Sequence, residues 1–240
     1  MNKKLKVFFG ISYLFILLIF LYFIFSKFQI NRINDFLYYK ELQTNLEIYI
    51  GSNLYINLFL FSLFAIIWVM LLGFGSPLLI FSGILFGKWI GTLISVISIS
   101  LGALLLYSIA NFFLEDFFKK IFKDKFSKYI NLFKKNEFYY YFVFRFVGGL
   151  GVPFFLQNIL PVIFNMKKLP YFFSSMLGFI PGFFVFNTIG AGLKKYIKES
   201  ESFSFIDLIL NKEIYFPLVL FVCLIFLSLF IKKKVFDARY

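Results

Sequence analysis

One charged side chain, that of Arg145, lies inside the otherwise apolar stretch 138–166, and two amide side chains, Gln157 and Asn158, follow it there. An arginine at the centre of a membrane helix costs roughly 2.5–3.5 kcal/mol on insertion scales, so such a residue faces the protein interior, a wet cavity or an anionic group. A guanidinium group binds phosphate through paired hydrogen bonds. We therefore predict that Arg145, Gln157 and Asn158 contact the headgroup of an anionic lipid. The alternative is that Arg145 snorkels to the headgroup layer or caps carbonyl groups of broken backbone.

Two segments that contain glycine and proline share one pattern and lie 76 positions apart. Gly73–Leu79 and Gly149–Phe155 both read Gly-apolar-Gly-x-Pro-apolar-apolar. Apolar segments interrupted by Gly and Pro at corresponding positions of two halves are typical of transporter binding sites. Irregular backbone at membrane depth is tolerated only where it is buried in protein or lines a water-filled cavity. We therefore predict two re-entrant segments, 73–87 and 145–164, that meet inside the membrane; the alternative is that both are simple kinks. The residues predicted to shape the breaks are Gly73, Gly75, Pro77, Gly83, Gly87, Gly149, Gly151, Pro153 and Pro181.

The rest of the chain has the composition of a membrane protein. Of its 240 residues, 61% are hydrophobic and 15% are charged, whereas soluble domains are about 45–50% apolar. About 20 apolar residues suffice for a spanning helix, so we predict an all-α, polytopic membrane protein with about five spanning helices. The predicted spans are Val7–Phe25, Leu54–Leu72, Trp89–Phe112, Pro170–Leu193 and Ile214–Ile231.

The positions of the charged residues divide the chain into three parts. Residues 1–53 hold the first span and a polar connector, 54–193 form a membrane domain with both broken segments, and 194–240 hold a connector and the last span. Within the membrane domain, residues 115–137 place apolar side chains three and four positions apart with lysines between them. This spacing predicts a basic amphipathic helix on the membrane surface.

Cysteine, histidine and acidic residues limit the chemistry of the chain. It has one Cys and no His, which excludes an intramolecular disulfide, a His-based catalytic triad and an HExxH zinc site. No Asp or Glu lies inside an apolar run, so a buried carboxylate relay for protons is not evident. We expect no catalytic residues, no metal and no cofactor, and we do not expect an enzyme. The net charge of +13 comes from lysines at the ends of apolar runs, as in topology signals, and nucleic-acid binding is not expected.

Further residues around the two broken segments recur in a fixed order. In the first half they are Pro77–Gly87, which reads PLLIFSGILFG, then Gly91 and Ser100–Ala103. In the second half they are Phe144, Arg145, Pro153, Phe154, Asn158, Phe172, Gly178, Pro181, Gly182 and Gly190. This order resembles the VTT domain of the DedA superfamily, also called SNARE-associated, over residues 72–193.

The resemblance implies a helical membrane protein with two re-entrant loops that face each other. Family members are implicated in moving lipids between leaflets, as phospholipid scramblases in eukaryotes and in recycling of the undecaprenyl phosphate carrier in bacteria. By this resemblance, Arg145 matches the family's arginine before the second loop, and Pro77 and Pro153 match the loop prolines.

The chain departs from the family pattern at three places. Residues 73–77 hold no acidic side chain, Asn111 stands where a basic residue often follows the third span, and Pro161 stands where Gly is usual.

We therefore expect a protein that moves or organises lipids across the bilayer, phospholipid or polyprenyl phosphate, in the manner of a scramblase or flippase, and so supports membrane homeostasis. The alternatives are an ion- or proton-coupled transporter of small solutes and a membrane scaffold without transport. The expected partners are membrane lipids with anionic headgroups, and homo-oligomerisation is left open. The expected location is a bacterial inner membrane.

Overall fold

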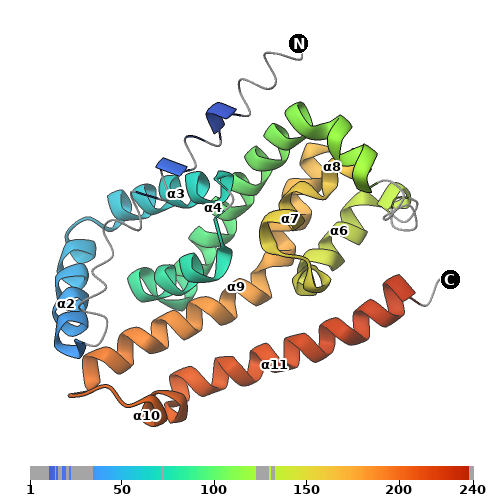
Figure 1. The fold of residues 1–240 in the computed structure, drawn as a ribbon. Coiled ribbons are helices and arrows are strands. Elements are labelled where there is room, and N and C mark those ends of the chain that lie inside the picture. Colours follow the sequence, from blue (N-terminus) through green and yellow to red (C-terminus); the bar gives the residue numbers. More distant parts are fainter. Residues whose placement is uncertain are drawn as a thin grey trace.

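The computed structural model describes residues 11–13, 15, 18, 19, 22, 35–71, 73–122, 130 and 133–237. Every regular element in this part of the chain is helical, which confirms the predicted all-α fold (Figure 1). The elements are α2 (Phe36–Ser52), α3 (Leu54–Met70), α4 (Gly75–Phe122), α6 (Glu137–Phe146), the 3₁₀ turn η2 (Gly148–Gly151), α7 (Phe154–Ile159), α8 (Pro161–Phe164), α9 (Lys168–Glu199), α10 (Phe205–Leu210), α11 (Lys212–Lys232) and the π-helical turn η3 (Lys233–Asp237).

Three helical stretches in the described residues are long and apolar enough to cross a bilayer: Gly75–Phe113, Lys168–Glu199 and Lys212–Val235. The helices α2 and α3 would add a fourth if they counted as one span, although they are bent by 111° at their junction. The predicted span Val7–Phe25 lies mostly outside the described residues, as does the middle of the predicted amphipathic helix 115–137. The first residues of that predicted helix, up to Phe122, continue α4.

The first broken segment forms the tip of a helical hairpin. α3 ends at Met70, and α4 begins at Gly75. Between them, the indole Nε1 of Trp68 donates a hydrogen bond to the carbonyl oxygen of Phe74 at 2.8 Å and closes the turn. Pro77 lies in the first turn of α4, where a backbone N–H has no intrahelical acceptor and its loss costs no bond.

The two arms of this hairpin are α3 and residues 75–86. Phe61 and Phe86 lie at similar distances along the chain from the turn, and their ring centroids are 5.4 Å apart, so the arms run antiparallel. The predicted span Leu54–Leu72 is thus one arm of the hairpin. The predicted segment 73–87 is helical apart from its first residues and its last.

The chain reverses a second time at Gly87, whose φ of 76° and ψ of 178° interrupt α4. Glycine adopts this conformation without the steric penalty that a Cβ would impose. A straight helix would hold Ser82 and Ser95 about 20 Å apart, yet the hydroxyl of Ser95 donates to Oγ of Ser82 at 3.0 Å. α4 therefore consists of the short arm 75–86 and a long helix, 88–122, folded back on each other.

The second hairpin consists of α6, the tip η2, and the returning helices α7 and α8. Gly148, Gly149 and Gly151 at the tip have φ values of 68°, 74° and 82°, so the irregular backbone predicted in this segment is present. The backbone N–H of Lys167 donates to Oε2 of Glu137 at 3.0 Å. The hairpin therefore begins beside the residue that precedes α9.

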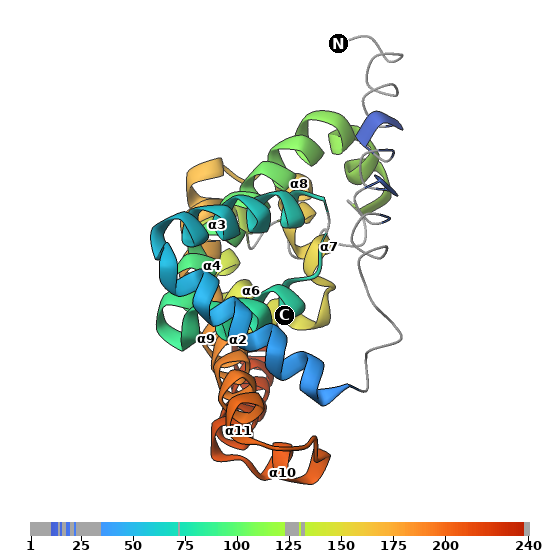
Figure 2. The same cartoon turned by 90° about the vertical axis from the view of Figure 1, so that its left-hand side faces the viewer.

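The first hairpin begins at the opposite end of α9. Helix α2, which leads into α3, is tied there by Glu47, whose carboxylate pairs with Lys194 at 3.2 Å and with Lys198 at 3.4 Å. Figure 2 shows α2 lying across this end of the molecule. The polar connector predicted before the membrane domain thus contains a helix.

Glycines allow the short arm 75–86 to cross α9 in close contact. A Cβ at Gly83 would collide with the backbone carbonyl of Asn187, and a Cβ at Gly190 would collide with that of Ile80. Small residues at such crossings permit membrane helices to approach through van der Waals contact. The short arm is therefore fixed to α9 by backbone-to-backbone packing.

Gly83→Ala should weaken this crossing, because the added methyl group meets backbone atoms that cannot turn aside. We expect a loss of about 1–3 kcal/mol in the free energy of unfolding, measured by denaturant unfolding in detergent. Gly51→Ala is the control, since a Cβ at this position in α2 has no atom within 4 Å and alanine favours helix over glycine. Equal losses in the two variants would contradict the close crossing.

Candidate functional site

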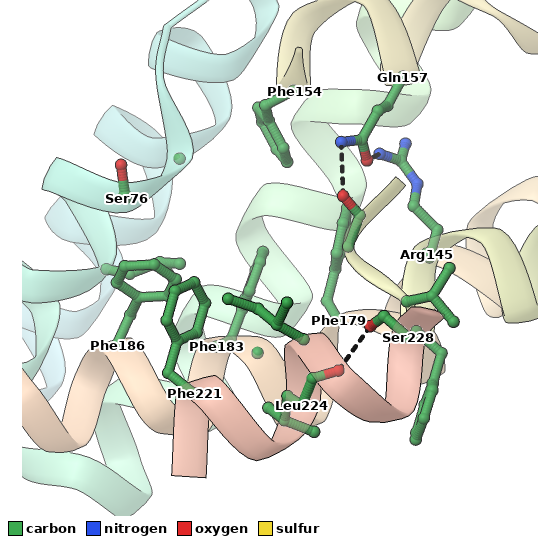
Figure 3. Close-up of a pocket in the computed structure, with 18 of the residues that line it drawn as sticks. Ser76, Arg145, Phe154, Gln157, Phe179, Phe183, Phe186, Phe221, Leu224 and Ser228 are labelled. Carbon is green, nitrogen blue, oxygen red and sulfur yellow. Dashed lines mark hydrogen bonds between the residues drawn. The ribbon is translucent and has the colours of Figure 1, made fainter. Parts of the chain in front are cut away.

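The tips of both hairpins, together with α9 and α11, enclose a partly open cavity of about 570 Å³ (Figure 3). Its lining residues fall in the ranges 74–79, 145–157, 178–186 and 221–229. The tips also touch each other, since a Cβ at Gly75 would lie 3.7 Å from the ring of Phe154. The tips of the two predicted segments are therefore in contact at this cavity.

Arg145 lies in the last turn of α6 and is only 3% exposed. Its Nη1 donates to Oε1 of Gln157 at 3.1 Å. Its Nη2 donates to Oδ1 of Asn158 at 2.6 Å and to the hydroxyl oxygen of Tyr171 at 3.1 Å. The three predicted headgroup residues are thus brought together, because α7 returns alongside α6 after the tip.

No carboxylate of the described residues pairs with the positive charge of Arg145. None of the ion pairs among the described residues includes it, and its buried Nε has no hydrogen-bond partner there. The Nδ2 of Asn158, which is fully buried, likewise has no acceptor in the described part of the chain. Buried donors without acceptors, and buried charges without counter-charges, cost free energy. The site therefore favours a ligand that supplies negatively charged oxygen atoms.

Four aromatic rings surround the guanidinium group. Its Cζ lies 4.7 Å from the ring centroid of Phe179, 4.9 Å from Tyr141, 5.8 Å from Tyr171 and 6.0 Å from Phe154. Aromatic ring faces attract cations electrostatically, and more strongly where water is excluded. Unlike a carboxylate, the rings stabilise the charge without neutralising it, so the charge remains available to an anion.

Gln157 connects Arg145 to the tip of the second hairpin. Its Nε2 donates to the carbonyl oxygen of Val152 at 2.7 Å and to that of Gly148 at 3.3 Å, while its Oε1 accepts from Arg145. A Cβ at Gly149 would collide with this amide group, so glycine makes room for it. Gln157 therefore both positions the arginine and satisfies carbonyl groups of the irregular backbone.

Of the three predicted headgroup residues, Arg145 and Gln157 line the cavity, whereas Asn158 has no exposed surface and lies behind them. The sequence analysis missed Tyr171, whose hydroxyl oxygen accepts from Arg145, and Tyr141, whose hydroxyl donates to the carbonyl oxygen of Gln157 at 2.7 Å. Tyr141 precedes Arg145 by one helical turn and shares its face, which is a signal present in the sequence. Tyr171 is brought to the site by α9 and has no such signal.

The residues predicted to shape the breaks differ in what they do. Gly87, Gly149 and Gly151 have positive φ, as chain reversals require. Pro153 precedes α7 as its N-cap residue. Pro181 lies inside α9, which continues through it as one helix, so this proline does not end the helix.

The spacing of 76 positions extends from the two motifs to the packing of the arms. A Cβ at Gly102 would lie 3.0 Å from Cβ of Val69, and a Cβ at Gly178 would lie 2.5 Å from Cβ of Arg145. Gly178 follows Gly102 by 76 positions, and Arg145 follows Val69 by the same number. Because the hairpins begin at opposite ends of α9, the halves are related as an inverted repeat. Only the second half has a charged side chain at this position.

Asn158→Leu should cost about 1.5–3 kcal/mol in the free energy of unfolding, because a hydrogen bond to a charged group is lost. In an Arg145→Met background the same change should cost much less, since no buried charge is left without its acceptor. A double-mutant cycle measured by unfolding in detergent gives the coupling energy. Ser228→Ala is the control, because the Ser228 hydroxyl donates to Leu224 of its own helix and should not couple to Arg145. A coupling energy near zero for Asn158 would contradict the assigned hydrogen bond.

Comparison with known proteins identifies one matching family. The family model named VTT domain matches residues 73–192. The match starts at the first hairpin tip and ends near the end of α9, so it includes both tips, Arg145 and the two long helices, and it leaves out α3 and α11. Neither the curated proteins nor the solved structures contain a match to the chain. The matched segment is half of the chain and contains the tips of both hairpins. This integral membrane protein therefore belongs to the VTT-domain family of DedA, SNARE-associated proteins.

Proposed function

We propose that this protein moves lipids with phosphate-bearing headgroups between the leaflets of the bilayer, and that the headgroup passes through the cavity beside Arg145. The observation that carries the proposal is a buried guanidinium group, without a carboxylate partner among the described residues, at a cavity where two hairpin tips meet.

The depth of the cavity supports this proposal. Lys168 and Lys194 flank the apolar part of α9, and a helix between these positions is about 39 Å long. A bilayer has a hydrocarbon core of about 30 Å, or 40–45 Å with its headgroup layers. Gly178, which contacts Arg145, and Gly182, which lines the cavity, lie near the middle of this helix. With α9 spanning the bilayer, the cavity is near the midplane, where a polar headgroup is least stable in lipid.

In the same placement, each hairpin enters from one side and turns back near the midplane, which is the re-entrant arrangement. The tips contain irregular backbone, and such backbone is tolerated in a membrane only against protein or a wet cavity. Both tips meet that condition, because residues of each line the cavity.

The lining of the cavity favours a lipid over a small polar solute. Arg145 and Gln157 lie at one end, while phenylalanine rings and aliphatic side chains form most of the remaining wall (Figure 3). A lipid presents the same division into a charged group and a hydrocarbon part. None of the described residues that line the cavity is acidic, so this lining gives no support to the alternative of a proton-coupled solute transporter. The basic, cysteine-poor chain supports a bacterial inner membrane as the location.

Arg145→Ala should reduce lipid movement at least ~10-fold in vesicles reconstituted with the purified protein. The assay follows a fluorescent phosphatidylglycerol, and a membrane-impermeant quencher reports the fraction in the outer leaflet. Arg145→Lys should also lose most of the activity, because an ammonium group cannot form the paired hydrogen bonds of a guanidinium group.

Two controls sharpen this test. Lys88→Gln removes an exposed lysine outside the cavity and should leave lipid movement unchanged. A fluorescent glycolipid without phosphate should move much more slowly than phosphatidylglycerol through the unaltered protein. Equal rates for both lipids, or full activity of Arg145→Ala, would refute the role of the arginine.

A further inference from the structure

Helix α11 forms one wall of the cavity although it is hardly embedded in the protein. Phe221, Leu224, Ile225, Ser228 and Leu229 line the cavity from this helix. Yet only 11% of its most apolar stretch is buried inside the protein, against 39% for that of α9 and 56% for that of α4. The family match also ends before α11. The cavity is thus closed on this side by a helix that the inverted repeat does not contain.

The attachment of α11 is uneven along its length. At the start of α11, Glu213 pairs with Lys195 of α9 at 3.0 Å. The backbone carbonyl of Glu213 also lies so close to Gly192 of α9 that a Cβ at Gly192 would collide with it. Further along, the contact with α9 is apolar, with the ring centroids of Phe186 and Phe221 at 5.3 Å. The one hydroxyl group on the cavity side, that of Ser228, donates within its own helix. Among the described residues, polar contacts therefore hold α11 to α9 at its base only.

An outward movement of α11 would turn no unsatisfied polar side chain of its cavity-lining part toward lipid. The opposite face of the helix is already apolar and exposed, as Phe226 at 67% and Phe230 at 64% show. The inner face is apolar as well, apart from the internally bonded Ser228. In a bilayer, apolar side chains exchange contacts with protein for contacts with lipid chains at little cost, since lipid is as apolar as they are.

The cavity is too small to hold a whole lipid, so the hydrocarbon chains of the ligand need an opening in its wall. A space of about 570 Å³ is in the range of pockets for small molecules and does not enclose a lipid with two long chains. A lipid whose phosphate lies at Arg145 must therefore extend its chains out of the cavity. On the side closed by α11, the wall beyond the base of this helix contacts α9 through apolar side chains.

We propose that a hydrocarbon chain of the lipid binds in the seam between α9 and α11, and that α11 swings outward about its base to admit it. The seam is lined by Phe183 and Phe186 of α9 and by Phe221, Leu224 and Ile225 of α11. The ligand is a long-chain lipid, recognised here by its hydrocarbon part rather than by its headgroup. This inference rests on the proposed function and adds the binding subsite of the chain and the path by which it enters.

A reducible cross-link between α9 and α11 tests the movement. The only cysteine of the chain, Cys223, is replaced by alanine, and Phe186→Cys and Phe221→Cys are introduced at the apolar contact. A short bifunctional thiol reagent should then lower lipid movement at least ~10-fold relative to the same protein before treatment, and a reductant should restore it. The control pair, Lys195→Cys and Glu213→Cys, joins the helices at the base, and its cross-linking should leave the rate unchanged.

A lipid with a photoreactive group near the end of its acyl chain gives a readout that does not depend on transport. In the protein without the cross-link, it should label Leu224 and Phe183 inside the seam as well as the lipid-facing Phe226. The cross-link between positions 186 and 221 should remove the labelling inside the seam and keep that of Phe226. Labels confined to Phe226 before cross-linking would overturn the proposal. An undiminished rate after cross-linking, in a protein that Arg145→Ala inactivates, would also overturn it and leave the proposed function standing.

Discussion

A guanidinium group buried between two hairpin tips has to be stabilised by dipoles and ring faces when no carboxylate is near. Arg145 receives amide oxygens from Gln157 and Asn158 and a hydroxyl oxygen from Tyr171. The amides reach it only because α7 returns along α6, and this return requires the positive φ values of the glycines in η2. The hydroxyl reaches it only because Gly178 lets α9 approach the arginine closely. The hairpin, its tip and the position of α9 thus all serve to hold one charge.

The same devices build the first half of the molecule without a charge. There the tip is closed by the indole of Trp68, and Gly102 allows the long helix 88–122 to approach Val69. The hydrogen bond between Ser82 and Ser95 joins the short arm to that helix. The two hairpins therefore share one architecture, although the first is packed with apolar side chains and the second holds the polar site. The chemistry of the site comes from a few residues that differ between them.

The sequence was sufficient for features that depend on strong local signals. The all-α fold follows from apolar runs between charge clusters, and the meeting of the tips follows from the repeated Gly-x-Gly-x-Pro pattern together with the rule that irregular backbone must be covered in a membrane. Arg145 was identifiable because a charged side chain in an apolar run is costly in a membrane and therefore indicates a functional site. Gly83 and Gly87 were both predicted to shape the first break, but the sequence did not show that Gly87 reverses the chain while Gly83 packs inside a helix.

Long-range contacts account for the rest of what the sequence did not show. Tyr171 reaches Arg145 through the path of α9, and no local pattern marks it. The role of α3 as an arm was hidden because a hairpin arm and a spanning helix have the same apolar composition. The participation of α11 in the cavity depends on how the chain returns after α10, which composition does not determine.

The inverted repeat with its single arginine has a consequence for direction. Val69 occupies the position in the first half that Arg145 occupies in the second, so under the proposed function a headgroup arriving from either leaflet would meet the same charge. Binding sites along a passive passage change the rate of transfer and not its net direction, because they leave the free energies of the lipid in the two leaflets unchanged. If the protein moves lipids as proposed, the net movement would follow the difference in lipid concentration between the leaflets, and any net pumping would need a source of free energy outside this site.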